Sequence, residues 1–115
     1  MTENLPLFHW APRERHLQIV RRGLIPGSRP NIASARFPVV CLADTPSWAW
    51  SLSGRMRWAP TGEWDLWQTW LDRLTEPEII EDWTGNRPSG IYEVRTAHRV
   101  WKRDLWFVAS RTKTQ

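Results

Sequence analysis

The hydrophobic pattern at the start of the chain predicts a short β-strand over residues 5–10, LPLFHW. Successive side chains of a strand point to opposite faces, so His9 and Trp10 would lie on different sides of it. The pattern then predicts a helix, a second strand and a second helix, followed by a half made mostly of strands. This order is typical of an α+β domain.

The first helix is predicted over residues 12–22. Pro12 suits the first helical turn. Hydrophobic residues recur at helical spacing at Leu17, Val20 and Leu24. Gly23 stands where a helix commonly ends in a residue with positive φ. Residues 26–34 contain two prolines, a glycine and several polar residues, which predicts an irregular loop.

The second strand and the second helix are predicted over residues 37–43 and 46–53. The segment FPVVCLA is a nearly continuous apolar run of strand length, as expected of a buried strand. Thr45 is a suitable N-cap, Pro46 suits the first helical position, and Gly54 fits just beyond the end.

Strands dominate the predicted second half. Residues 91–96 and 105–110 are rich in β-branched and aromatic residues, which favours strands. Residues 63–74 leave two possibilities open, because the Trp and Leu spacing is helical while the Trp content and short length also allow a strand. With a frayed tail at residues 111–115, the chain is expected to form a single domain over residues 1–110.

Composition limits the classes of protein that fit. Ten of the 115 residues are Trp, so this aromatic surface must serve a core, a ligand pocket or a partner. The single Cys41 excludes an internal disulfide and fits a small buried side chain. Three scattered His residues give no metal-ligating spacing, so no metal site is expected. The sequence has neither a signal pattern nor an apolar run of membrane-spanning length, which predicts a cytoplasmic protein without a membrane partner.

Charge is unevenly distributed along the chain. Residues 1–57 and 85–115 each carry a net charge of +5, whereas residues 58–84 carry −6. Most of the basic residues are Arg, which favours bidentate contacts with phosphate or carboxylate groups. The acidic segment interrupts the basic stripe that is typical of nucleic-acid-binding proteins, and this argues against that class.

Three segments of the chain each contain a distinct motif. LFHWAPRERHLQIVRRGLIPGSR reads as a strand ending in His, a helix and Gly-Leu-x-Pro, and VVCLADTPSWAW as an apolar strand, a Thr-containing turn and a short helix. GIYEVRTAHRVWKRDLWFVASRT contains a Glu-bearing strand and a closing strand. Together they cover most of the chain and resemble the ADP-ribosyltransferase-like superfamily, above all its small bacterial and phage members. Val100-Trp101-Lys102 departs from the Ile-Pro-Pro turn that is common there.

The resemblance implies two small half-sheets around a cleft with two or three short helices, and NAD bound there as a substrate. It implies that His9 on the first strand binds the ribose and that Glu93 orients the attacked ribose, which makes these two the catalytic residues. Trp48 or Trp50 would stack on the nicotinamide. Thr45 corresponds to the Ser or Thr at the end of the family's second strand.

The chemistry of the reaction agrees with a carboxylate in this role. Cleavage of the nicotinamide–ribose bond builds positive charge on the ribose, which a nearby carboxylate stabilises. In the strand over residues 91–96, Glu93 shares a face with Arg95, which would keep the carboxylate ionised. The alternative is an ordinary ion pair on the solvent face of that strand. Asp104, at the start of the last predicted strand, is a second candidate for the acidic role.

The other candidate binding residues each have a structural alternative. A neutral His9 can donate one hydrogen bond to a hydroxyl, or it can be a hydrogen-bonded core residue. Arg13 lies at a helix start that suits pyrophosphate, or on a solvated helix face. Trp48 and Trp50 point in different directions on a helix, so only one can face a cleft. Core packing is the expected role of Trp64, Trp67, Trp101 and Trp106.

Two functions remain open at this point. The first is an NAD-consuming ADP-ribosyltransferase-like enzyme that modifies a protein or nucleic-acid acceptor. The second is a non-enzymatic phage or mobile-element protein of the same fold, which binds a host protein through exposed Trp and Arg side chains. NAD should raise the melting temperature in the first case only.

Overall fold

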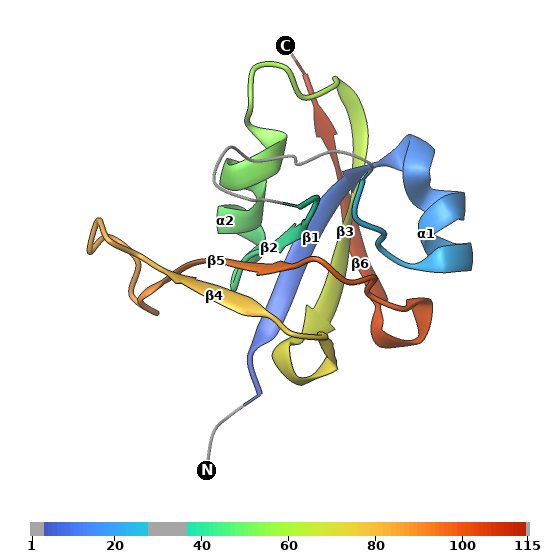
Figure 1. Ribbon diagram of the computed structural model, residues 1–115. Coiled ribbons are helices and arrows are strands. Elements are labelled where there is room, and N and C mark those ends of the chain that lie inside the picture. Colours follow the sequence, from blue (N-terminus) through green and yellow to red (C-terminus); the bar gives the residue numbers. More distant parts are fainter. Residues whose placement is uncertain (1–3, 28–36, 115) are drawn as a thin grey trace.

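Two three-stranded antiparallel sheets and two short helices form the fold of the computed structural model, which describes residues 4–27 and 37–114 (Figure 1). The first sheet has the order β1 (Pro6–Pro12), β3 (Gly62–Trp70), β6 (Trp106–Lys113). The second has the order β2 (Val40–Leu42), β5 (Ile91–Thr96), β4 (Glu78–Glu81). The helices are α1 (His16–Arg22) and α2 (Pro46–Ala49). This arrangement confirms the predicted α+β class with two small sheets.

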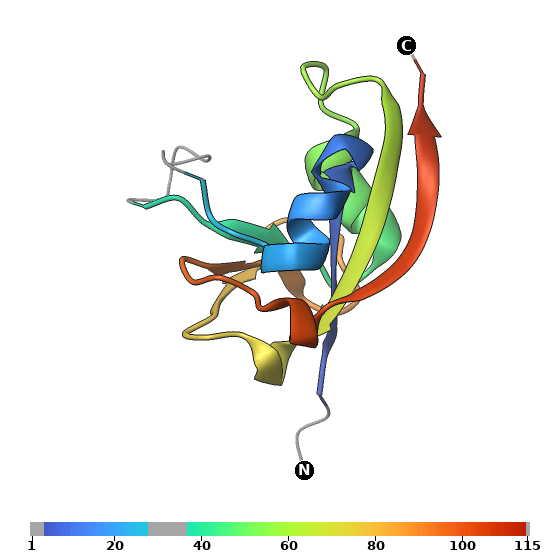
Figure 2. The same ribbon diagram turned by 90° about the vertical axis from the view of Figure 1, so that its right-hand side faces the viewer.

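The first sheet lies between the two helices, with α1 on one face and α2 on the other (Figures 1 and 2). Burial on both faces explains why four consecutive residues of β3, Trp64–Trp67, are all buried. This resolves the ambiguity over residues 63–74 in favour of a strand. The helical spacing of the Trp residues there reflected burial on two faces, because a strand covered on both sides loses its simple alternation.

Each face of the first sheet has its own hydrophobic cluster. One cluster joins Trp10, Trp64 and Leu66 to the helix α2 through Ala49 and Trp50. The other joins the opposite face to α1 and to the second sheet, through Leu7, Ala11, Ile19, Leu24, Val40, Leu42, Trp67, Val94 and Val100. The strand β1 contributes to both clusters.

The helix α1 is shorter than predicted and buries a different residue. It begins at His16 because β1 continues through Pro12 and a 3-10 turn, Arg13–Arg15, lies between them. Ile19 is buried, whereas Leu17 and Val20 of the predicted face are 67% and 47% accessible. Leu24, the third residue of that face, is buried as predicted, but it lies beyond Gly23 and outside the helix. The helix is only seven residues long, so it contacts the sheet over one turn rather than along a stripe. Gly23, with φ of 80°, ends it as predicted.

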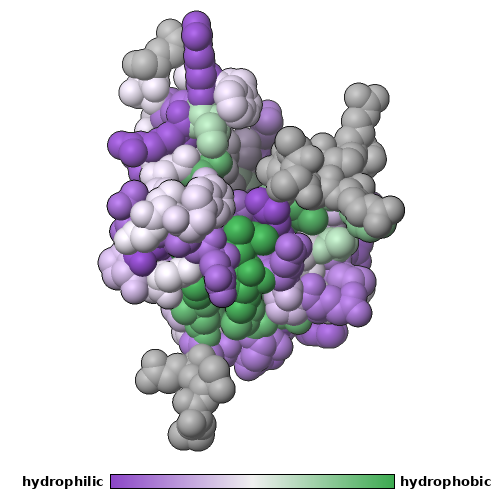
Figure 3. Space-filling model, turned by 60° about the vertical axis from the view of Figure 1, so that its left-hand side comes forward, coloured by the Kyte–Doolittle hydropathy of each residue, from purple (hydrophilic) through white to green (hydrophobic). Residues whose placement is uncertain are grey.

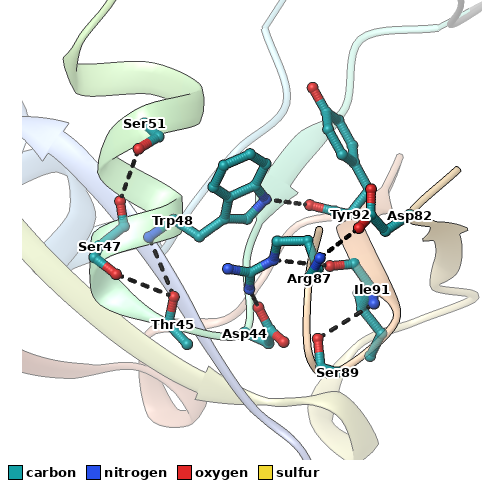
Figure 4. Close-up of polar contacts among 10 residues, drawn as sticks. All are labelled: Asp44, Thr45, Ser47, Trp48, Ser51, Asp82, Arg87, Ser89, Ile91 and Tyr92. Atoms are coloured by element: carbon teal, nitrogen blue, oxygen red, sulfur yellow. Dashed lines mark hydrogen bonds and ion pairs between the residues drawn. The ribbon is translucent and has the colours of Figure 1, made fainter. Parts of the chain in front are cut away.

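The strand β2 covers only part of the predicted segment 37–43. Three of its residues pair with β5, in the register Val40↔Thr96 and Leu42↔Val94. The predicted helix over 46–53 is confirmed as α2 followed by a wider π-helical turn, Trp50–Gly54. Thr45 is its N-cap, because its hydroxyl oxygen accepts a hydrogen bond from the Trp48 N–H at 3.1 Å (Figure 4).

The C-terminal half contains one strand that the sequence did not predict and one that is longer than predicted. The short strand β4 has two Ile residues between two Glu residues, so it shows no alternation of apolar and polar positions, and it pairs with β5 alone. The strand β6 continues past residue 110 to Lys113, where a frayed tail was expected. It is held there by pairing with the start of β3 and by the Lys113 ammonium, which donates to the carbonyls of Met56 and Ala59.

The surface carries more aromatic residues than expected. Trp64 and Trp67 are buried as predicted, but Trp101 and Trp106 are each 47% exposed. Trp101 lies outside the strands, directly after the buried Val100, and Trp106 begins β6, an edge strand whose residues are nearly all exposed. In the face that Figure 3 presents, hydrophobic surface is gathered in one area with polar residues around it. Among the described residues, no helix is long and apolar enough to cross a membrane. The predicted loop over 26–34 falls mostly outside the described residues.

Candidate functional site

A cavity of about 280 Å³ brings residues from both sheets together. Its lining comes from β1, β2, β5, the helix α2 with its π-helical turn, and the segment after that turn. His9 and Glu93 both line it, although they lie on strands of different sheets. The two residues that the resemblance assigns to catalysis therefore meet at one cavity. Thr45, Arg13, Trp48 and Trp50 are not among the described residues that line it.

His9 is held in one orientation by the backbone of the second sheet. Its Nδ1 donates a hydrogen bond of 2.8 Å to the Cys41 carbonyl oxygen, since a carbonyl can only accept. Burial lowers the pKa of His9, and Arg15 adds to this effect, against the opposing influence of the Cys41 hydrogen bond. The imidazole is therefore neutral at neutral pH, with its proton on Nδ1. The remaining nitrogen, Nε2, can accept a hydrogen bond, whereas the sequence-based expectation was that His9 would donate one.

Glu93 forms a buried ion pair rather than a surface one. Its Oε1 accepts a hydrogen bond from Arg95 Nε at 2.7 Å, and the two side chains are only 7% and 14% exposed. The predicted pairing is confirmed, and the alternative of a solvent-exposed pair is wrong. β5 is the central strand of its sheet, and both of its faces are covered at this point, since Glu93 and its neighbour Val94 on the opposite face are both buried. A carboxylate buried this deeply needs its cation in place.

Arg13 lies elsewhere, on the α1 face of the first sheet. Its Nε donates to Asp65 Oδ1 at 2.7 Å and its Nη2 to Ser110 Oγ at 2.6 Å. Asp65 is fully buried and binds His16 Nδ1 as well. The predicted pyrophosphate role of Arg13 is not supported by this arrangement, because the guanidinium is already committed to a buried carboxylate in the same sheet.

Trp50 is a core residue and not a stacking platform. It is 7% exposed and lies between Trp10 and Trp64, with ring centroids 5.3 and 5.5 Å away in edge-to-face geometry. This is the preferred geometry of aromatic pairs in protein interiors. Its ring is therefore fully engaged by protein.

Trp48 is engaged by β5 and by the loop before it (Figure 4). Its indole N–H donates to the Tyr92 carbonyl at 2.7 Å, and the Arg87 guanidinium lies 4.7 Å from its ring centroid. Arg87 in turn pairs with the buried carboxylate of Asp44. These contacts dock the loop between β4 and β5 onto α2, so Trp48 has a structural explanation.

Trp58 is the aromatic residue at the cavity that sequence reasoning missed. It lines the cavity together with Met56, and it is 81% exposed. It stands in an irregular segment between Gly54 and Pro60, outside any helix or strand. The sequence signal that could have identified Trp58 is its place in a polar loop without helical or strand periodicity, because a Trp in such a loop is not expected to pack in the core.

Two other expected residues have structural roles. Thr45 caps α2, as described above. Asp104, the second candidate for the acidic role, is buried and lies 3.4 Å from Arg73 Nη1, outside the cavity. Cys41 is half-buried and lines the cavity, where its carbonyl orients His9.

The chemistry of the cavity follows from its lining. Aromatic and aliphatic side chains make up most of the lining, and no described Arg or Lys is part of it. His9 offers a hydrogen-bond acceptor and Glu93 a carboxylate. Such a cavity suits a flat, uncharged or cationic ring that carries a hydroxyl group, and it does not suit a phosphate.

Compared with known families, with characterised proteins and with solved structures, the chain shows no significant match.

Proposed function

We propose that the protein binds NAD at this cavity and transfers its ADP-ribose to an acceptor, on a fold of the ADP-ribosyltransferase-like type. One observation carries the proposal: His9 and Glu93, which the family resemblance pairs in one site, line a single cavity between two sheets. Nothing in the hydrophobic pattern alone requires a His from one sheet and a Glu from the other to converge.

The cavity size supports binding of one half of the dinucleotide. Ligand pockets usually measure about 300–1,000 Å³, so 280 Å³ lies just below that range. The nicotinamide and its ribose fit the apolar lining, the carboxylate and the hydrogen-bond acceptor. The pyrophosphate would lie outside the cavity, where it is accessible to solvent.

The reaction requires little covalent chemistry from the protein. The bond between the nicotinamide nitrogen and ribose C1′ breaks with its electron pair on the nitrogen, and neutral nicotinamide leaves. An oxygen or nitrogen of the acceptor forms the new bond to C1′ and releases its proton to water. Positive charge develops on the ribose as the bond breaks, and the Glu93 carboxylate supports it electrostatically. His9 Nε2 accepts a hydrogen bond from a ribose hydroxyl and so orients the sugar.

Thermal unfolding with and without NAD tests the proposal. NAD should raise the melting temperature of the wild type, because a ligand that binds only the folded state stabilises it. The Glu93→Gln variant should retain binding and lose transfer of ADP-ribose, measured as nicotinamide release, by at least a hundredfold. Asp44→Asn is the matched control, since it also removes one buried carboxylate that is paired with an Arg.

Breaking a buried ion pair costs about 3–5 kcal/mol, so both variants lose stability. Trp58→Ala provides a test without that cost, because the side chain is 81% exposed. It should reduce the shift caused by NAD while it leaves the melting temperature of the free protein unchanged. The proposal fails if NAD does not stabilise the wild type, or if Glu93→Gln and Asp44→Asn release nicotinamide at equal rates.

A further inference from the structure

A second hollow of about 230 Å³ lies beside the candidate cavity and has the opposite character. Three cationic residues line it, namely Arg55, Arg111 and Lys113, together with the hydroxyl-bearing Thr112 and Thr114. No carboxylate is among its described lining residues. We name this site the cationic hollow.

The cations of this hollow are not neutralised by acidic side chains. Lys113 Nζ donates to the carbonyl oxygens of Met56 and Ala59 at 2.7 and 2.8 Å, and a carbonyl carries no full charge. The Arg111 guanidinium lies 4.0 Å from the ring centroid of Trp50, which fixes its position by a cation–π contact. Arg55 makes no side-chain hydrogen bond or ion pair within the described part of the chain. Within the described residues, positive charge therefore accumulates here without a carboxylate to balance it.

The acidic residues of the central segment are directed away from this hollow. Five of them lie in or next to the 3-10 turn after β3 and the strand β4: Asp72, Glu76, Glu78, Glu81 and Asp82. The C-terminal end of β6 and the strand β4 stand at opposite ends of the molecule in both ribbon views (Figures 1 and 2). Glu63, which pairs with Thr112 in the sheet register, turns to the other face and binds Arg13 at 3.4 Å. The acidic run in the sequence therefore does not neutralise the basic surface in three dimensions.

The cationic hollow adjoins the candidate NAD cavity. Gly54 and Arg55 line the hollow, whereas Met56 and Trp58 line the cavity. A segment of only a few residues thus separates the two sites. A chain bound in the hollow would bring its neighbouring groups to the exposed Trp58 at the rim of the cavity.

We propose that the acceptor is a single-stranded nucleic acid whose phosphate binds in the cationic hollow; this inference rests on the proposed function. Guanidinium groups bind phosphate in a bidentate manner. An exposed Trp beside a cationic groove is the combination by which proteins hold unpaired bases, through stacking. A duplex would keep its bases away from Trp58, so a single strand is the form that uses both features.

Fluorescence anisotropy with labelled DNA and RNA oligonucleotides of about ten nucleotides, without NAD, tests this inference. The wild type should bind with an affinity that falls as salt rises. The Arg55→Gln/Arg111→Gln variant should bind at least tenfold more weakly at about 50 mM salt, and its salt slope should fall by about 1.4, the loss of two phosphate contacts on a single strand. The control is Arg21→Gln/Arg22→Gln, which removes the same charge from the exposed last turn of α1 and should change affinity less than twofold.

Three outcomes overturn the inference: no binding by the wild type, equal weakening in both double variants, or equally strong competition by polyglutamate. The last would identify an acidic peptide as the acceptor. Failure of the proposed function is distinguishable, because it would show as an absent NAD effect on melting temperature while oligonucleotide binding persists. Arg55→Gln/Arg111→Gln changes no residue that lines the NAD cavity, so NAD should stabilise this variant as it does the wild type.

Discussion

Asp65 holds several elements of the first sheet together through its carboxylate. It is fully buried and accepts hydrogen bonds from Arg13 Nε at 2.7 Å, His16 Nδ1 at 2.7 Å and Ser110 Oγ at 2.9 Å. Burial by itself would raise the pKa of Asp65, but hydrogen bonds from His16, Arg13 and Ser110 hold it below its ordinary value. The carboxylate thereby joins the start of α1 to two neighbouring strands.

The Asp65→Asn variant should be less stable than the wild type at neutral pH by about 3 kcal/mol, since it leaves donors without their charged acceptor. Because the folded state lowers the pKa, the stabilising effect of Asp65 is complete above the unfolded value of 3.8 and is lost as pH falls through the folded value. Urea unfolding between pH 7 and pH 2 should therefore show a smaller decline in the variant. Glu63→Gln, which removes an exposed partner of Arg13, should change stability by less than about 0.5 kcal/mol. Parallel pH profiles for wild type and Asp65→Asn would contradict this account.

At the scale of elements, the junction between α1 and the last strands depends on one glycine. Gly23 has φ of 80°, and a Cβ there would overlap the backbone carbonyl of Val100. This close approach is what allows Leu24 and Val100 to exchange backbone hydrogen bonds of 2.9 and 2.8 Å. The end of α1 and the backbone pairing of Leu24 with Val100 therefore both require that residue 23 has no side chain.

Gly23→Ala should destabilise the protein by about 2 kcal/mol or more, because it adds a steric overlap to an unfavourable φ. Gly85→Ala is the matched control: Gly85 has φ of 75° but open space around its Cα, so only the conformational cost of about 1 kcal/mol applies. Chemical denaturation of the two variants measures the difference. Equal losses would mean that the contact with Val100 adjusts without cost.

Elements with their own hydrophobic or capping signals could be predicted from the sequence. The strand β5 has the predicted bounds, and the helix after Thr45 follows its N-cap, proline and glycine. The strand β4 was not predicted, because four residues with two adjacent Ile show no alternation, and its pairing with β5 makes it a strand. The buried face of α1 was assigned wrongly because so short a helix shows too few turns to define a periodicity.

The candidate site could be predicted only in part, because contacts between residues far apart in the sequence leave no local signal. His9 and Glu93 were found through the family resemblance, and the ion pair with Arg95 follows from strand alternation. The engagement of Arg13 by Asp65, and of Trp50 by other Trp rings, depends on contacts between residues far apart in sequence. Periodicity within one element contains no information on such partners.

At the scale of the whole molecule, β1 joins the two sheets into one structure. Phe8 and Ala43 exchange backbone hydrogen bonds of 2.7 and 3.0 Å, and His9 adds its bond to Cys41. Leu7 and Trp10 of the same strand belong to different hydrophobic clusters. A loss of β1 would therefore open both cores and the cavity between the sheets.

Both sheets should consequently unfold together. Native-state hydrogen exchange should give the same opening free energy for protected amides in β3 and in β5, such as those of Leu66 and Val94, and the two should respond equally to urea. A lower opening free energy throughout the second sheet, with a weaker dependence on urea, would contradict this prediction. It would show that the sheets are separate cooperative units.

The contact between Arg111 and Trp50 has a practical consequence. The guanidinium lies directly over a buried indole, at 4.0 Å from the ring centroid, and its other side faces the cationic hollow. Indole emission responds to the electric field of a nearby charge, so an anion that pairs with Arg111 changes the light emitted by Trp50. The protein thus contains its own optical reporter of phosphate binding, which needs no label and can be read in a titration.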